Sequence, residues 1–516
     1  MVGQQKCGKR LEQPARNAAG EVKTQKAGGA DRLLDLTAKE VKPQAIKKEM
    51  PGPGSRMKKL KGKPVTVASN ARQNKQAVDA VFKATAPEYL MILGAPDVVP
   101  HQDLRNLMYK KDDDMDAHAY GDLPYACEGG YSQDTTRFKG PTRVVGRLPD
   151  LRGAREPSYL IKLLKIAGAY RPRDVKEYAR YFGMSTQSWE ESTAMSLFAI
   201  FGNSDALSLA PPTKPPLPAA KLAPLMHFIN CHGGSSDPEF YGESRSLKSQ
   251  PVSMTSDSVK KKIKPGTVAS IECCYGAEMY DSVTLSLPMP ICQRYLEQGA
   301  YGYFGSSTIA YGPADSNGAA DLITQFFLLA VLDGASLGRA ALMARQRFVE
   351  QVGELDPVDL KTLAQFSLLG DPAVQPARVP TATGTPRTAD REEIERLQRR
   401  ERRAKLRVQG NYLQETKPTA ARREMGVRKS ASVRKALSNI ARSAGIGAKS
   451  DFVAYSVARP AASRVRDAKA APLATRYYVA LNTPKGQRGD RVNRGVAAVA
   501  KEVRGRIVGY RIYTQR

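Results

Sequence analysis

Two short apolar segments between residues 227 and 280 each end in a pair of reactive side chains. The first ends at Cys231 and His232, and the second ends at Cys273 and Cys274. Both segments are rich in Ile, Val and Phe and run into small, turn-forming residues, a pattern typical of a buried parallel strand that leads into a loop. The carboxyl ends of neighbouring parallel strands lie side by side, so a His and a Cys that are 42 residues apart can meet there. The sequence therefore predicts a nucleophile and its base at one edge of a sheet.

The chemistry predicted for this pair is acyl transfer. A thiol is mostly protonated at neutral pH, and a nearby imidazole can take the proton so that the thiolate attacks a carbonyl carbon. His232 would then return the proton to the leaving amine. The backbone N–H groups of Gly233 and Cys274 are the predicted oxyanion donors, because Gly lets the backbone approach closely and a loop that leaves a strand points its amides outward. The acidic candidates for orienting the imidazole are Asp205 and Glu272.

The same cysteines allow two alternatives. Strand alternation places Cys273 and Cys274 on opposite faces of the sheet, and we predict Cys274 as the nucleophile and Cys273 as a small core residue. Cys231 is interpreted as a core residue by the same logic. These cysteines and His232 are also zinc-ligand types, but adjacent residues in an extended chain point to opposite faces, and paired zinc ligands usually have two or more residues between them. We therefore predict no metal site and no cofactor.

The elements that would position these residues alternate between strands and helices from Pro64 onward. This order predicts an α/β fold with a mainly parallel sheet flanked by helices. Strands are expected at about residues 65–68, 89–94, 142–149, 196–205, 227–232, 267–274 and 300–311, and helices at about 71–84, 156–169, 291–298, 319–332 and 337–352.

The two ends of the chain carry its positive charge. The formal net charge is +10 over residues 1–63, −2 over 64–380 and +21 over 381–516. Residues 1–63 are interpreted as a basic disordered arm, because they are too poor in apolar residues to fold alone. Basic ends of this kind are compatible with a nucleic acid or an acidic partner. Beyond the central region, we predict a basic linker over 381–474 with a charged helix near 390–407, and a small α+β module over 475–516 with a helix at 492–503.

Two classes of protein are disfavoured by the sequence. It holds no run of eighteen apolar residues, so no transmembrane segment is predicted, and its basic N-terminus has no apolar segment behind it, unlike a secretory signal. Six cysteines in 516 residues are too few and too unevenly spaced for a disulfide framework. We therefore expect reduced thiols and a cytoplasmic location.

Seven short motifs follow one another between residues 93 and 372: Leu93-Gly94-Ala-Pro-Asp97 with Val99-Pro100, Asp122-Leu-Pro-Tyr125, Val145-Gly146-Arg147-Leu148, Cys231-His232-Gly233, the Cys274 segment, Gly305-Ser-Ser-Thr308, and Leu369-Gly370-Asp371-Pro372. Their order and spacing resemble the gingipain cysteine peptidases, a branch of the caspase-like fold in the clan of caspases, metacaspases and clostripain. The resemblance covers roughly residues 64–378, which is the size expected of a single catalytic unit. It implies a caspase-like catalytic domain over 64–380.

The resemblance also implies an activity. In that family a Cys follows one strand and a His-Gly follows its neighbour, which implies a cysteine endopeptidase with Cys274 as nucleophile, His232 as base, and a protein or peptide as substrate. Related enzymes cut after Arg or Lys with the help of an acidic residue at the base of the first specificity pocket, since a carboxylate pairs with a guanidinium. Asp205 lies in about the matching segment, although the Pro-rich loop after it is shorter than the family pattern. The residues that match the wall of that pocket are Ser306, Ser307, Thr308 and Tyr311.

A function from a different class also remains open. The protein could be a catalytically inactive caspase-fold scaffold that binds nucleic acid or another partner through its basic tails. If it is instead a peptidase that cuts after Arg or Lys, self-cleavage is expected at the Arg-rich sites between residues 381 and 407.

Overall fold

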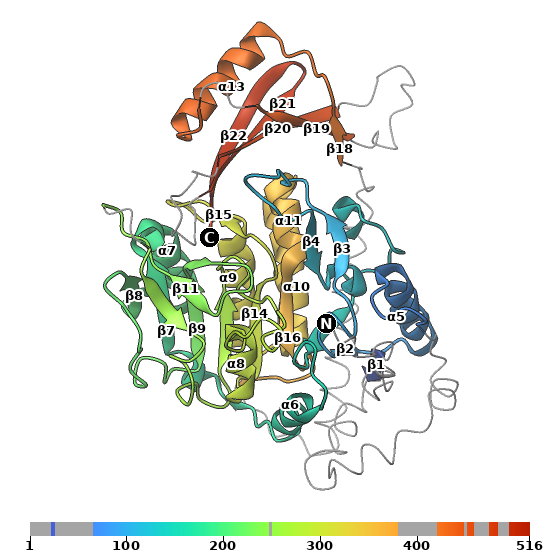
Figure 1. The fold of residues 1–516 in the computed structure, drawn as a ribbon, viewed down its shortest axis with the longest axis vertical. Coiled ribbons are helices and arrows are strands. Elements are labelled where there is room, and N and C mark those ends of the chain that lie inside the picture. Colours follow the sequence, from blue (N-terminus) through green and yellow to red (C-terminus); the bar gives the residue numbers. More distant parts are fainter. Residues whose placement is uncertain are drawn as a thin grey trace, which may run out of the picture.

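The computed structural model describes residues 22–25, 65–246, 250–379, 421–447, 451–458, 474–482 and 495–516, and Figure 1 shows its fold. The largest sheet among these residues has nine strands in the order β1-β2-β5-β16-β14-β13-β9-β7-β8. The five strands from β14 to β8 are parallel to one another, and β2, β5 and β16 form a second parallel group. Antiparallel pairs join β14 to β16 and β1 to β2. The predicted α/β fold with a mainly parallel sheet is confirmed. Its strands are β1 (Val22–Gln25), β2 (Tyr89–Leu93), β5 (Val144–Leu148), β7 (Tyr181–Thr186), β8 (Leu207–Ala210), β9 (Met226–Asn230), β13 (Val268–Ile271), β14 (Gly302–Ser306) and β16 (Phe366–Gly370).

Helices cover both faces of this sheet, and successive residues of each strand alternate between two cores. On β14, Phe304 faces the core under α9 and α10, whereas Tyr303 faces the core under α6 and α8. This alternation is the reason why the strands are apolar throughout, as expected when both faces are covered. The helices are α5 (Ala71–Thr85), α6 (Ser158–Gly168), α7 (Glu190–Phe201), α8 (Ile291–Glu297), α9 (Ala320–Leu332), α10 (Leu337–Val352) and α11 (Pro357–Gln365).

The strand predicted over 196–205 is wrong, because most of this segment belongs to helix α7. A short apolar run does not distinguish a buried strand from a buried helix. The helix ends at Gly202, whose φ of 77° lies in the left-handed region and whose N–H bonds back to the Phe198 carbonyl. The chain then reverses into β8, which pairs in parallel with β7. Asp205 therefore precedes a strand instead of following one.

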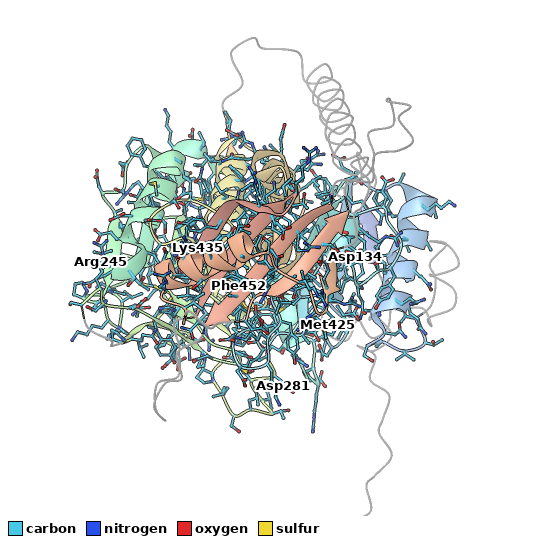
Figure 2. The ribbon with its side chains drawn as sticks, turned by 90° about the horizontal axis from the view of Figure 1, so that it is seen from above. Asp134, Arg245, Asp281, Met425, Lys435 and Phe452 are labelled. Carbon is cyan, nitrogen blue, oxygen red and sulfur yellow. The ribbon has the colours of Figure 1, made fainter. Side chains whose placement is uncertain are left out.

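A second sheet is formed by the C-terminal part of the chain and lies over the larger sheet, as Figures 1 and 2 show. Within the described residues it has six strands in the order β15-β22-β21-β20-β19-β18, all antiparallel. On β20, Tyr477 and Val479 pack into the same core as α9 and α10, whereas Tyr478 and Ala480 pack under α13. The elements are β15 (Tyr311–Gly312), β18 (Ala421–Glu424), α13 (Ala431–Ser443), β19 (Val453–Ala458), β20 (Ala474–Asn482), β21 (Val496–Val503) and β22 (Arg506–Gln515).

Two predictions about this region are wrong. The predicted module boundary at 475 divides one sheet, since β18, α13 and β19 come from the segment interpreted as a linker. The helix predicted over 492–503 is strand β21. Its Ala-rich sequence favours a helix, but Ala497 and Val499 face one core while Ala498 and Ala500 face the other, so pairing with β20 and β22 decides the structure. The β21–β22 hairpin turns at 504–505, where both φ angles are positive, 51° and 77°.

The ends of the chain are described only in part. Residues 22–25 of the predicted disordered arm form β1, an edge strand on β2, and the rest of the arm lies outside the described residues. The predicted charged helix near 390–407 also lies outside them. No helix in the described part of the chain is long and apolar enough to cross a membrane. The described residues also form three small sheets: β3 (Gln102–Arg105) with β4 (His118–Gly121), β6 (Arg173–Asp174) with β17 (Ala377–Arg378), and β10 (His232–Gly233) with β11 (Glu239–Tyr241) and β12 (Val252–Thr255).

Candidate active site

His232 and Cys274 follow the carboxyl ends of two neighbouring parallel strands. β9 and β13 pair in register with Ile229 opposite Ile271, and each candidate comes three residues after its Ile. The Cys274 side chain belongs to the core on the α9 side of the sheet. The His232 ring lies edge-on to the Trp189 ring, 4.5 Å between centroids, just before α7 on the same side. The structure therefore brings the two candidates to equivalent positions on one face of the sheet.

The two loops that carry these residues touch backbone to backbone. Gly233 packs so closely against the Cys274 carbonyl that an added Cβ would clash with it. Two residues before Gly233, the Cys231 N–H donates to the sulfur of Cys273, the residue before Cys274, at 3.4 Å. Cys231 and Cys273 are fully buried in the opposite core, and burial raises the pKa of both thiols. This position suits a small core residue and excludes Cys273 from the face that carries His232.

Glu243 contacts the imidazole of His232, with 3.1 Å between its Oε2 and Nε2 of the ring. It lies in the loop that links β11 (Glu239–Tyr241) to β12 (Val252–Thr255). The short strand β10 (His232–Gly233) pairs antiparallel with β11, His232 opposite Tyr241, and this pairing carries the start of the loop back to the ring. The carboxylate beside the base is therefore Glu243, whereas the sequence offered Asp205 and Glu272.

The Cys274 thiol is buried beneath the loop that follows β14. Its sulfur accepts a hydrogen bond from the Ala310 N–H at 3.3 Å, and the residue is 4% exposed. Burial raises the pKa of this thiol to about 12, against smaller effects of the Ala310 N–H and the Lys361 ammonium in the opposite direction. Lys361 is itself paired with Asp114 at 2.5 Å and with Asp116 at 3.3 Å. In this closed arrangement the thiol is therefore protonated.

A buried pocket on the His232 side of the sheet holds the guanidinium group of Arg516. Its Nη2 lies 2.9 and 3.1 Å from the two carboxylate oxygens of Asp321, at the start of α9. The same nitrogen donates to the Pro313 carbonyl at 2.7 Å and to the Ser192 hydroxyl at 3.4 Å. The Trp189 ring forms a cation–π contact, 4.5 Å from the guanidinium carbon to its centroid. A carboxylate, a carbonyl and an aromatic face together are a site for a planar cation.

A second carboxyl group lies at the floor of this pocket. Glu272, directly after β13, is fully buried and accepts a hydrogen bond from Thr324 at 3.1 Å. Burial, followed by the charge of Asp321, raises the pKa of Glu272 well above its usual range. Burial raises the pKa of Asp321 as well, but the charge of Arg516 is the next largest effect there and lowers it. We therefore assign the negative charge that faces the guanidinium to Asp321, which contacts Nη2.

The predicted pocket residues are not in the pocket. Asp205 is exposed at the amino end of β8, the opposite end of the strands from Cys274, because the segment before it is a helix. The hydroxyl groups of three predicted wall residues bond inside the protein, Ser306 to Thr308 O at 2.8 Å, Ser307 to Tyr120 O and Thr308 to Gln365. The fourth, Tyr311, bonds to Asp114 at 2.9 Å through its hydroxyl, and its backbone contributes to β15.

The sequence analysis missed three residues of this site: Trp189, Glu243 and Asp321. Asp321 had a usable signal, since it is an acidic residue in the first turn of an otherwise apolar helix. Trp189 is the one Trp in the sequence but has no motif around it, and Glu243 is one of several acidic loop residues. Among the described residues, no group of three or more His, Cys, Asp or Glu side chains is arranged to hold a metal ion.

Comparisons with known proteins identify part of this region. Residues 223–377, which include His232, Cys274 and Asp321, match the model of peptidase family C25. The resemblance to gingipain-like cysteine peptidases is confirmed for this segment, which supports a cysteine peptidase. No match is found among curated proteins.

Two solved structures also resemble the chain at the level of overall shape. One, described as the structure of a protease, is 13% identical over 87% of this chain and 89% of its own length, with a TM-score of 0.42. The other, the Saccharomyces cerevisiae separase–securin complex, is 13% identical over 47% of this chain but only 14% of its own, with a TM-score of 0.27. Neither likeness is close enough to bear on the function of this chain.

Proposed function

We propose that the protein is a cysteine endopeptidase that hydrolyses the peptide bond after an arginine, with Cys274 as the nucleophile and His232 as the base. The observation that carries the proposal is the in-register pairing of β9 and β13, which puts both residues three positions beyond a shared rung of the sheet and on the same face. Parallel strands are about 4.8 Å apart, so side chains at such positions are within reach of each other after a small loop adjustment.

In the proposed reaction His232 takes the Cys274 proton, and the thiolate attacks the scissile carbonyl carbon. Glu243 is bound to Nε2 of the ring, so we assign the proton exchange to Nδ1. The tetrahedral intermediate collapses when the C–N bond breaks and His232 gives the proton to the leaving amine. Water then gives a proton to His232 and attacks the thioester carbonyl carbon, the S–C bond breaks, and His232 passes that proton to the sulfur. Glu243 holds the ring in place and stabilises the imidazolium that forms.

The oxyanion would be stabilised by backbone N–H groups. The Cys274 N–H already donates to a backbone carboxyl oxygen, that of Arg516, at 3.1 Å. Gly233, the second predicted donor, lies in contact with the Cys274 backbone. Removing one such donor typically costs ~10²–10³ in kcat, so this pair would contribute substantially to the rate.

The pocket supports a preference for arginine over lysine. Asp321 supplies one buried negative charge, which either cation could neutralise. The bonds to Asp321 and to the Pro313 carbonyl come from a single nitrogen, so they do not distinguish the two cations. The preference rests on the Trp189 face, because a weakly hydrated guanidinium contacts an aromatic ring better than a compact ammonium does. The pocket acid predicted from the sequence is thus replaced by Asp321, while the predicted basic specificity is kept as a proposal.

The test is hydrolysis of fluorogenic peptides that end in Arg, Lys or Ala, assayed for the 516-residue chain and for its Arg516→Ala variant. Cys274→Ala and His232→Ala should each lower kcat on the order of 10⁴-fold or more, as removal of a nucleophile or base does elsewhere. Cys273→Ala is the matched control, since its thiol lies in the opposite core. If the parent chains and their Cys274→Ala variants are folded and equally inert, the peptidase proposal fails, and an inactive scaffold with basic tails is the function to test.

Self-cleavage between 381 and 407 is part of the same proposal, because this segment holds several arginines and links the two sheets in the sequence. Mass spectrometry of the purified chain should find fragments that end in Arg within it. Cys274→Ala should remain intact under the same conditions.

A further inference from the structure

The last strand of the C-terminal sheet reaches into the candidate active site. β22 pairs with β21 from Val503–Arg506 to Val496–Thr514, and its final residues pair with β15, Gly312 opposite Thr514 and Tyr311 opposite Gln515. In Figure 1 the C-terminus lies beside β15. One antiparallel strand therefore connects the C-terminal sheet to the loop that covers Cys274.

The backbone of Arg516 continues this pairing up to the nucleophile. Its N–H donates to the Ala310 carbonyl at 3.0 Å, and an oxygen of its backbone carboxyl group accepts the Cys274 N–H at 3.1 Å. An extended peptide that adds a strand to an open edge, with its carbonyl on the oxyanion donor, is how a substrate would lie in such a site. The backbone carboxyl group of Arg516 thus occupies the place that the scissile carbonyl of a substrate would take.

The side chains of the same segment are anchored on the protein. Arg516 is 1% exposed, with its guanidinium on Asp321 and Trp189. Gly312 is the residue that admits it, since a Cβ there would clash with Arg516 Nη2. Two further residues are fixed nearby: Thr514 donates to Gly312 O at 3.0 Å, and Tyr513 donates to Asp356 at 2.7 Å.

We propose that residues 513–516 are a built-in competitor for the substrate site, in which Arg516 fills the arginine pocket and keeps Arg-containing peptides out. The inference rests on the proposed function, since it takes the groove beside Cys274 to be the substrate groove. It adds a regulatory state: the chain is closed while the segment is docked, and it opens when the segment leaves.

The competition should be strong because the competitor is tethered. A tethered segment acts at an effective concentration on the order of mM, so a segment whose own untethered Kd for the site is ~100 µM should suppress binding of a short peptide about 10-fold. The neighbouring β21 holds the rest of β22 in register and shortens the search for the groove. Release of Arg516 is therefore expected to raise activity by ~10-fold or more.

The first experiment compares initial rates on an Arg-ended fluorogenic peptide at a concentration below KM. Arg516→Ala should be at least ~10-fold faster than the unsubstituted chain by the same estimate. Arg506→Ala, which removes an exposed arginine at the other end of β22, is the matched control and should leave the rate unchanged. Equal rates for the unsubstituted chain and Arg516→Ala would overturn the proposal. If Arg516→Ala does not fold, as judged by thermal melting, Arg516→Gln is assayed in its place, because it keeps a polar side chain without the charge.

The second experiment needs no catalysis and separates this inference from the proposed function. A fluorescent peptide with the sequence of residues 513–516 is titrated into Cys274→Ala and into Cys274→Ala/Arg516→Ala, with anisotropy as the readout. The competitor is supported if the peptide binds only to the double variant and if this binding is lost when Asp321→Asn is added. That conclusion holds even if no variant hydrolyses peptides, a result that would contradict only the proposed function. Equal binding to both variants, or binding to neither, would overturn the competitor.

Discussion

Asp321 is the residue that most directly tests the arginine pocket. Its carboxylate is fully buried and is the group that pairs with the guanidinium, 2.9 and 3.1 Å from Nη2. Removing one partner of a buried charge pair costs ~3–5 kcal/mol, which corresponds to a factor of ~10²–10³ or slightly more in affinity. Asp321→Asn should therefore lower kcat/KM for an Arg-ended peptide while leaving an Ala-ended peptide almost unaffected.

The neighbouring Glu272 should reduce that loss. Its pKa is raised first by burial and then by the charge of Asp321, so Asp321→Asn removes the second cause while the substrate guanidinium still attracts an anion. Glu272 should then ionise in part and replace the missing charge. We expect the single variant to lose only ~10–10² in kcat/KM, and Asp321→Asn/Glu272→Gln to lose the full ~10²–10³. Glu272→Gln alone should cost less than either.

The assay measures kcat/KM for Arg-, Lys- and Ala-ended peptides in the Arg516→Ala chain, where the pocket is open, and the readout is the ratio of the Arg to the Ala value. Asp315→Asn, which changes an exposed Asp in the loop before α9, is the control and should leave the ratio unchanged. An unchanged ratio in the double variant would refute the assignment of this pocket. A larger effect of Glu272→Gln than of Asp321→Asn would show that the wrong carboxyl was taken to carry the charge.

Three further predictions follow from the structure. Glu243→Gln should keep the fold and lower kcat on the order of 10²-fold or more while leaving KM little changed, because it removes the negative charge beside the His232 imidazolium. Measuring kcat and KM separately over a range of pH checks this prediction. Gly312→Ala should lower kcat/KM for Arg-ended peptides ~10–100-fold, since its Cβ would occupy the space of the guanidinium, and an unchanged Arg-to-Ala ratio would contradict it. Burial raises the pKa of the Asp371 carboxyl to about 6, so the folded chain binds the proton of this group more tightly than the unfolded chain does. The stability gained from this proton is complete below about pH 4 and is lost as the pH rises through 6, by up to ~3 kcal/mol. Urea unfolding across this pH range should show the decrease in stability for the unsubstituted chain and no such decrease for Asp371→Asn.

The positions of the proposed nucleophile and base at neighbouring strand ends could be predicted because each is tied to a local pattern. His232 and Cys274 directly follow apolar strands, and the geometry of a parallel sheet brings strand ends together whatever the distance along the chain. The prediction that Asp205 lies in the specificity pocket was wrong for a local reason as well. The segment before it was predicted as a strand but forms most of helix α7, so Asp205 lies at the amino end of β8, the opposite edge of the sheet from Cys274.

The pocket could not be predicted in this way, because tertiary packing assembles it. Trp189 lies just before α7, whereas Pro313 and Asp321 lie in the loop before α9 and in its first turn, and nothing in the sequence marks the two segments as partners. The strand β21 shows the same limit at the level of the fold. Its Ala-rich sequence favours a helix, and only the two strands beside it and the two cores that it separates make it a strand.

The C-terminal sheet contacts the larger domain through residues 513–516 and also elsewhere. Several of the contacts that hold this sheet to the larger domain lie outside residues 513–516: Tyr477 and Val479 are in the shared core, and Lys501 pairs with Glu354 at 2.6 Å. β22 pairs with β15 at only two positions, Tyr311 and Gly312, whereas it pairs with β21 along its whole length. Residues at the end of a strand open at far lower cost than the body of a sheet. The segment 513–516 can therefore leave the groove while the sheet stays docked, which is what a competitor that must both block and release an active site requires.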